Sequence, residues 1–91
     1  MIHFVYIIRS FKVGSYYKGY STRPFHRLRE HNENLSCYTA DKGPWELVYL
    51  QFFTDKKEAL IRERRLKKYS EDQILRLVGS PLNEIAKFKK H

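Results

Sequence analysis

The sequence has one cysteine, Cys37, and no long hydrophobic run. A single cysteine cannot close an internal disulfide or build a cysteine cluster for zinc, so we expect a reducing compartment such as the cytoplasm. The longest continuous apolar run is Phe4 to Ile8, whereas a membrane span needs about 20 apolar residues and the core of a signal peptide at least about 7. The sequence therefore predicts a cytoplasmic protein without a membrane partner.

Acidic residues are few: 10 Asp and Glu stand against 18 Lys and Arg, which gives a formal net charge of +8 and a pI near 9.7. Such a balance favours anionic polymers as partners, and nucleic acid is the leading candidate. An acidic membrane surface would attract the same charge. With 91 residues, 42% of them hydrophobic, the chain predicts one globular domain over residues 1–80 and a basic tail over 81–91.

Three segments have the pattern of β-strands. Ile2 to Arg9 is apolar on both alternating faces, which indicates a central strand covered on both sides. Tyr16 to Tyr20 is aromatic and follows a turn, so the two segments predict an antiparallel hairpin that places Tyr6 and Tyr17 on neighbouring strands. Trp45 to Phe53 is rich in bulky residues and predicts a third strand.

A first helix is expected after Ser21 and Thr22, with a hydroxyl as cap and Pro24 in the first turn. Arg27 and His31 are one turn apart on its flank and can touch each other. The side expected to face the core carries four residues at helical spacing: Phe25, Leu28, Asn32 and Leu35.

A long helix from Lys56 to Lys68, capped by Thr54-Asp55, carries mostly positive charge. Glu63 nevertheless lies among its apolar positions, where an ionised carboxylate is costly unless it is paired or bound to a cation. Two interpretations stay open: an ion pair with Arg62, Lys67 or a basic residue on another element, and a metal ligand. A last helix is expected from about Ser70 to Val78.

The order and spacing of these residues resemble the GIY-YIG nuclease superfamily, above all its small single-domain bacterial members. The first triplet departs from the family pattern because it lacks the glycine, and Asn83, the one late asparagine, falls in the predicted tail. The resemblance implies an α+β fold with a three-stranded antiparallel sheet flanked by three or more helices. It rests on Phe4-Val5-Tyr6, Tyr17-Lys18-Gly19, Arg27, Glu30-His31-Asn32, Pro44-Trp45 and Arg62-Glu63 before Leu66-Lys67.

The resemblance also implies roles. Glu63 would hold one divalent cation, Mg²⁺ or Mn²⁺, which polarises the phosphodiester and stabilises the departing oxygen. Tyr6 would accept a proton from the attacking water or orient it, Tyr17 would join the same hydrogen-bond network, and Arg27 would neutralise charge on the phosphorane. His31 is either a general acid or phosphate contact, or a half-exposed side chain on the helix flank.

We therefore expect metal-dependent phosphodiester hydrolysis by an endonuclease of low sequence preference, on DNA more than on RNA. The shape of the DNA or a protein partner would supply specificity. The alternative is a non-catalytic nucleic-acid-binding module on the same scaffold. In either case basic side chains would contact phosphates without reading bases, and the candidates are Lys18, Arg23, Arg29, Arg64, Arg65, Lys67 and Lys68.

Overall fold

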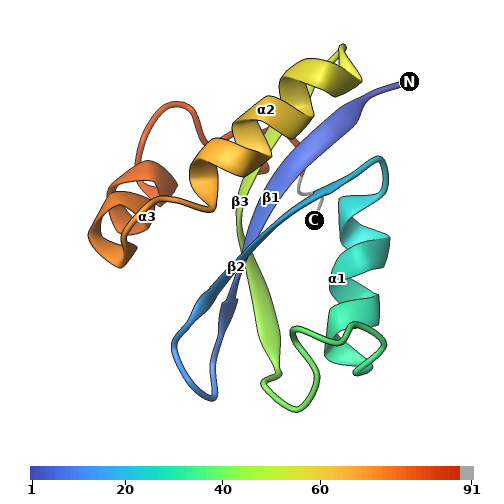
Figure 1. Ribbon diagram of the computed structural model, residues 1–91, viewed down its shortest axis with the longest axis vertical. Helices are drawn as coiled ribbons and strands as arrows, with labels where there is room; N and C mark the ends of the chain where they lie inside the picture. Colours follow the sequence, from blue (N-terminus) through green and yellow to red (C-terminus); the bar gives the residue numbers. More distant parts are fainter. Residues whose placement is uncertain (89–91) are drawn as a thin grey trace.

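Three antiparallel strands form one sheet in the computed structural model, which describes residues 1–88 (Figure 1). The order β2-β1-β3 places β1 (His3–Ser10) between β2 (Tyr16–Ser21) and β3 (Trp45–Phe53). The register sets Gly19 opposite Tyr6 and Tyr17 opposite Ile8. The predicted central strand and hairpin are confirmed, and so is the α+β fold class.

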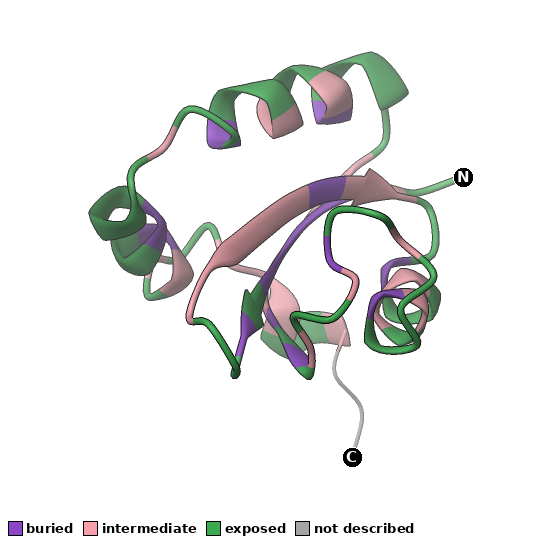
Figure 2. Cartoon of the chain, turned by 60° about the horizontal axis from the view of Figure 1, so that its bottom comes forward, coloured by how far each residue is buried: buried purple, intermediate pink, exposed green. Residues whose placement is uncertain are grey.

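Both faces of the sheet are covered, as the apolar pattern of β1 predicts. Val5 and Ile7 point to one face, where α2 (Lys56–Leu66) and α3 (Glu71–Val78) supply Ala59, Leu66 and Ile74. On the other face, Phe4, Tyr6 and Ile8 pack with residues of β3, with α1 (Pro24–Asn32) and with α4 (Ile85–Phe88). Figure 2 shows the buried residues along β1 and on the inner sides of the helices. The result is three layers, with the sheet in the middle.

Helices α2 and α3 begin at the capping residues that the sequence indicates. The Asp55 carboxylate accepts the Lys57 N–H at the start of α2. Ser70 and Gln73 form a reciprocal capping box at the start of α3. The start of α1 differs from the prediction, because Arg23 occupies the cap without a side-chain hydrogen bond to the helix. The Ser21 hydroxyl accepts the Arg23 N–H instead and so shapes the turn before the helix.

The buried side of α1 is rotated relative to the predicted one. Phe25 is 43% exposed and Leu35, which lies beyond the end of the helix, is 66% exposed. The inward positions are Pro24, Leu28 and His31, which share one face because they are spaced i, i+4 and i+7. His31 is completely buried, so the expected half-exposed position on the flank is wrong.

The segment after α3 is more ordered than a basic tail would be. The Asn83 side chain donates to the carbonyl oxygens of Val48 and Val78 and accepts the Leu50 N–H, which ties this segment to β3. In α4 the Phe88 ring packs edge-on against Phe4. The part of the predicted tail over residues 89–91 lies outside the described residues.

No helix in residues 1–88 combines the length and the apolar character that crossing a bilayer requires.

Candidate active site

A chain of three buried polar side chains lies between β1, α1 and the loop before β3. The Tyr6 hydroxyl is 2.9 Å from Nε2 of His31, and Nδ1 of His31 is 2.7 Å from the Thr39 hydroxyl. All three side chains are almost completely buried. Each buried polar atom of these three side chains has a hydrogen-bond partner, so none of them carries the cost of an unsatisfied buried group.

Burial determines the protonation state of His31, and its hydrogen-bond partners indicate its tautomer. Burial, with a smaller contribution from the Arg27 charge, lowers the pKa of His31 from 6.5 to about 4, so the ring is neutral at pH 7. We assign the proton of the neutral ring to Nδ1, because the Thr39 hydroxyl can donate to the carbonyl oxygen of Ser36 at 3.5 Å and accept from Nδ1 through its lone pair. Nε2 of His31 therefore accepts the Tyr6 O–H. Both ring nitrogens of His31 thus have partners within the protein.

Tyr17 completes an aromatic group around this chain. Its ring centre lies 5.0 Å from that of His31 and 6.4 Å from that of Tyr6. Ile8 is opposite Tyr17 in the β1–β2 ladder, so Tyr17 projects on the same face of the sheet as Tyr6. The two motif tyrosines thus lie side by side, as the hairpin predicts.

Arg27 brings a positive charge to the Tyr6 hydroxyl. Its Nη1 donates to the Glu30 carboxylate at 2.6 Å, and each of the two side chains is about one third exposed. The Arg27 charge lowers the pKa of Tyr6, but burial and the neighbouring Tyr17 outweigh it and raise that pKa to about 12. Tyr6 is therefore protonated at neutral pH, so any proton transfer through it needs an acceptor such as His31.

Glu63 lies on α2, with its side chain 16% exposed. Its carboxylate is 3.4 Å from the amine of Lys67, which is one of the ion pairs expected from the sequence. Arg62 is engaged elsewhere, with the Gln51 side chain and the Tyr69 ring. The Glu63 charge still acts on Tyr6, although it is the weakest of the influences on that pKa. Glu63 therefore lies near the tyrosines with an exposed lysine as its partner.

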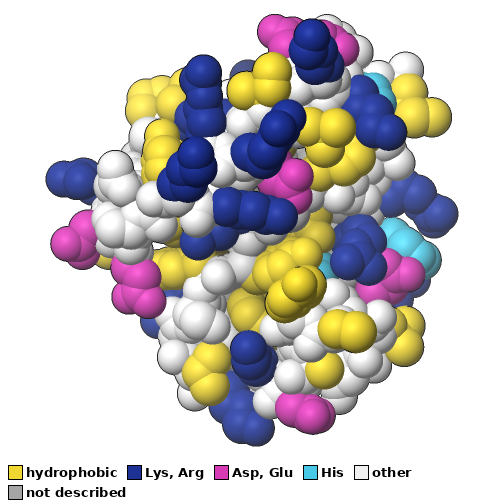
Figure 3. Space-filling view, viewed as in Figure 1, with side chains coloured by type: hydrophobic (Ala, Val, Ile, Leu, Met, Phe, Trp, Pro, Cys, Tyr) yellow, Lys and Arg dark blue, Asp and Glu magenta, His cyan; other side chains and the backbone are white. Residues whose placement is uncertain are grey.

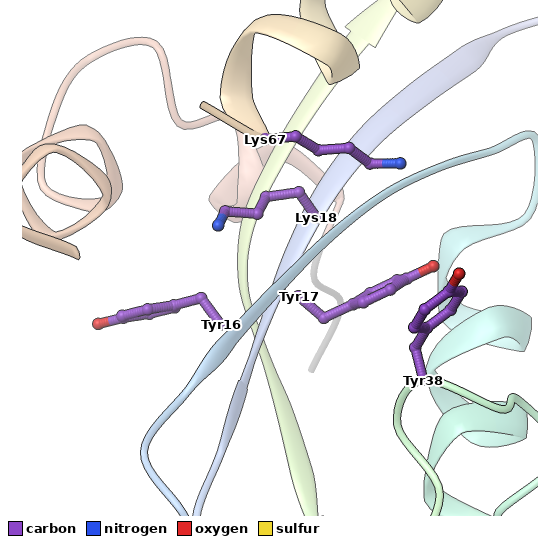
Figure 4. Close-up of a pocket in the computed structure, with 5 residues that line it drawn as sticks. All are labelled: Tyr16, Tyr17, Lys18, Tyr38 and Lys67. Carbon is purple, nitrogen blue, oxygen red and sulfur yellow. The ribbon is translucent and has the colours of Figure 1, made fainter. Parts of the chain in front are cut away.

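A cleft of about 280 Å³ opens beside Tyr17. It crosses the edge strand β2 and is lined by Tyr16, Tyr17, Lys18, Tyr38 and Lys67. Figure 4 shows the rings of Tyr17 and Tyr38 together on one side of β2, whereas the Lys67 side chain extends from the end of α2 above the strand and Tyr16 and Lys18 point away from the two rings. The cleft therefore adjoins the buried chain of Tyr6 and His31 through Tyr17.

The cations predicted to contact nucleic acid are distributed over several surfaces. Lys18 and Lys67 line the cleft, whereas Arg65 lines a separate groove with Phe53 and Ile61. Lys and Arg side chains gather over α2 in the view of Figure 3. The remaining candidates are exposed on α1 and on or just after α2: Arg23, Arg29, Arg64 and Lys68.

Two residues of the site were absent from the sequence-based prediction. Thr39 holds His31, and Tyr38 lines the cleft. Both lie in the loop between α1 and β3, which has no periodicity to mark inward-facing positions. In the described residues there is no group of three or more His, Cys, Asp or Glu side chains that could hold a metal ion.

Comparison with known proteins gives the family. Residues 2–75 match the model of the GIY-YIG catalytic domain. The chain is 38% identical over 80 residues to a UPF0213 protein of Clostridium perfringens, covering 87% of this chain and 85% of the relative. It is 40% identical over 77 residues to a UPF0213 protein of Staphylococcus epidermidis, covering 84% and 93%.

A solved structure agrees with both the sequence match and the fold. The solution NMR structure of a UPF0213 protein from Bacillus halodurans superimposes with a TM-score of 0.59 at 33% identity, covering 99% of this chain and 96% of that one. The structure agrees with the family match, because it brings Tyr6, Tyr17 and Arg27 close together within the residues that match the catalytic-domain model. The chain belongs to the GIY-YIG family, in its small single-domain bacterial form.

Proposed function

We propose that this protein is a metal-dependent endonuclease that hydrolyses phosphodiester bonds in DNA with little sequence preference of its own. The observation that carries the proposal is the meeting of four side chains from three elements: Tyr6, Tyr17, Arg27 and His31. They lie in a chain whose residues 2–75 match a catalytic-domain model. Buried titratable groups with shifted pKa values beside a cleft are typical of reaction sites.

In this proposal Tyr6 and His31 act on the attacking water as a pair. The Tyr6 O–H points to Nε2 of His31, so the phenol oxygen keeps its lone pairs for a hydrogen bond from water. As water attacks phosphorus, Tyr6 takes its proton and passes its own proton to Nε2. Tyr6 is 1% exposed, so the proposal requires that a neighbouring side chain such as Tyr17 or Arg27 moves when DNA binds and lets water reach the phenol oxygen.

Arg27 supplies positive charge where the phosphorane becomes more negative. Its guanidinium has a fork of N–H donors that fits two phosphate oxygens, and its present partner is the partly exposed Glu30 carboxylate. A phosphate competes with Glu30 for the same donors. Arg27 therefore links DNA binding to the exposure of the Tyr6 hydroxyl.

Glu63 fits a divalent cation such as Mg²⁺ or Mn²⁺. Mg²⁺ keeps several of its waters and is commonly bound by one or two carboxylates together with substrate phosphates, so one carboxylate suffices when DNA supplies the others. The Glu63 carboxylate is partly buried, and its ion-pair partner is the exposed Lys67 amine. When bound, the cation supplies charge neutralisation at the phosphate and the leaving oxygen.

A second candidate is the non-catalytic nucleic-acid-binding module. The burial of Tyr6 and the ion pair between Glu63 and Lys67 favour it, because both features would also suit a purely structural role. In that case the basic side chains over α2 bind phosphates and the tyrosines serve only for packing.

Purified protein incubated with supercoiled and branched DNA, with and without Mg²⁺ or Mn²⁺, separates the two candidates. The variants Arg27→Ala and Glu63→Gln are compared with Arg76→Ala, which removes an exposed cation of α3. We expect metal-dependent nicking that is lost in the first two variants and kept in the third. Salt-sensitive binding without cleavage in either metal would instead identify the binding module.

A further inference from the structure

We propose that the cleft beside Tyr17 holds one unpaired nucleotide of the DNA, with its base stacked on Tyr38. The substrate class is then DNA in which unpaired nucleotides adjoin the cleaved phosphate, such as a flap, gap or loop. This inference rests on the proposed nuclease function and adds a binding subsite to it. The residue that carries it, Tyr38, has no part in the reaction described above.

Tyr38 is a large aromatic side chain displayed to solvent next to the site. It is 78% exposed and shares the cleft with the motif residue Tyr17. Figure 4 shows both rings on the same side of β2, and Lys67 reaches the cleft from the end of α2, across the strand from them. A ligand in the cleft would therefore contact Tyr38 while it adjoins the Tyr6–His31 pair.

The backbone that carries Tyr38 is anchored to the site. The next residue, Thr39, is buried, and its hydroxyl bonds to His31. The Thr39 carbonyl oxygen accepts the indole N–H of Trp45 at 3.2 Å. Thr39 is thus fixed through both its side chain and its backbone, which holds the backbone next to Tyr38 close to the Tyr6–His31 pair.

The residues lining the cleft suit a nucleotide. Tyr17 and Tyr38 offer two aromatic rings for a base, Lys18 and Lys67 bring positive charge to the cleft, and none of the lining residues is acidic. Stacking on aromatic rings beside a cationic backbone track is the usual way in which proteins bind single strands.

The stacking surface selects an unpaired base. In a duplex each base is stacked between its neighbours and offers only its edges in the grooves. A tyrosine ring can reach the face of a base only when that base has left the stack. A protein partner could also use an exposed tyrosine, but the nearby Arg27 and the two lysines of the cleft favour a phosphate-bearing ligand.

The test uses the full chain in EDTA, so that no cleavage occurs, and two DNA probes that contain 2-aminopurine. One probe carries it in a short flap at a junction, and the other carries it in a fully paired duplex of the same sequence. We expect the wild type to quench the flap fluorophore by stacking. Tyr38→Ala should lose this quenching and bind the flap about 5- to 100-fold more weakly, with unchanged affinity for the duplex.

Two further variants serve as controls. Tyr38→Phe keeps the ring and should bind the flap like the wild type. Phe11→Ala removes another exposed aromatic ring, 58% exposed and outside the cleft, and should change nothing. Flap affinity that does not depend on Tyr38, or an equal loss on flap and duplex, overturns the inference.

A parallel cleavage assay with Mn²⁺ on the same flap separates this inference from the proposed function. Cleavage that is equally fast in the wild type and in Tyr38→Ala overturns the subsite and leaves the nuclease intact. Binding and quenching that depend on Tyr38, without any cleavage, support the subsite and overturn the nuclease. Tyr38-independent binding together with Tyr38-dependent capture of a protein assigns the ring to a protein interface and overturns the subsite.

Discussion

Gly19 lies directly beneath the hydroxyl end of Tyr6. The two residues are opposite each other in the β1–β2 ladder, and a Cβ atom built on Gly19 would lie 2.5 Å from the Tyr6 hydroxyl oxygen. No real Cβ contact is so short, so any other residue at this position would displace the phenol ring. The glycine of the second triplet thus leaves room for the tyrosine of the first.

Gly19→Ala should therefore move Tyr6 away from His31. Overpacking of this kind costs about 1 to 3 kcal/mol of unfolding free energy, and the proposed nicking activity should fall with it. Thermal unfolding and plasmid nicking measure the two effects. Gly79→Ala is the control, because its Cβ would meet only atoms at ordinary contact distance. Equal activity of the two variants would contradict the role of Gly19.

Thr39→Val should alter the tautomer of His31. The substitution removes the acceptor of the Nδ1 proton and leaves a buried N–H without a partner, at a cost of about 1 to 3 kcal/mol. The ¹⁵N chemical shifts of the imidazole show which nitrogen carries the proton. We expect the Nδ1–H form in the wild type and in Thr39→Ser, and a mixture in Thr39→Val. A wild-type ring protonated on Nε2 would refute the assignment.

The stability of the fold should decrease as the pH falls from 6.5 to 4. Burial lowers the pKa of His31 to about 4, so below pH 6.5 the unfolded chain binds a proton that the folded chain does not. The free energy of unfolding then falls by up to about 3 kcal/mol across this window. Urea unfolding at pH 7, 5.5 and 4.5 measures the slope, which should be flatter in His31→Gln. An equal slope in both proteins would show that other groups cause the loss.

Glu30→Gln should strengthen DNA binding. The Glu30 carboxylate holds Arg27 at 2.6 Å and competes with phosphate for the guanidinium. Fluorescence anisotropy at low salt measures the affinity, and Glu46→Gln, an exposed site on β3, controls for the change in net charge. The affinity should rise more in Glu30→Gln, whereas stability should change by less than about 1 kcal/mol. Equal affinities of the two variants would argue against phosphate binding by Arg27.

Much of the fold could be predicted because local signals and tertiary packing agree. The doubly apolar pattern of β1 is satisfied by two packed faces, and Asp55 and Ser70 cap their helices as their positions indicate. The short helix α4 could not be predicted, because four residues have no periodicity. Its order comes from contacts such as that between Phe88 and Phe4.

Part of the candidate site could be predicted from the sequence, but its hydrogen bonds and its loop residues could not. The spacing of motifs identified Tyr6, Tyr17 and Arg27, and the structure brings these three together. The burial of His31 could not be read from helical spacing, since it depends on hydroxyl partners on β1 and on a distant loop. Thr39 escaped prediction for the same reason.

The central claim, that the Tyr6 hydroxyl acts on the attacking water, is tested most directly by the single-turnover rate of DNA nicking in Tyr6→Phe and Tyr49→Phe. Both tyrosines are buried, and each hydroxyl has one side-chain partner, but Tyr49 bonds to Gln51 and belongs to the core on the other face of the sheet. We predict that Tyr6→Phe nicks about 10² to 10⁴ times more slowly than the wild type, while Tyr49→Phe nicks at close to the wild-type rate. Wild-type nicking by Tyr6→Phe would contradict the account.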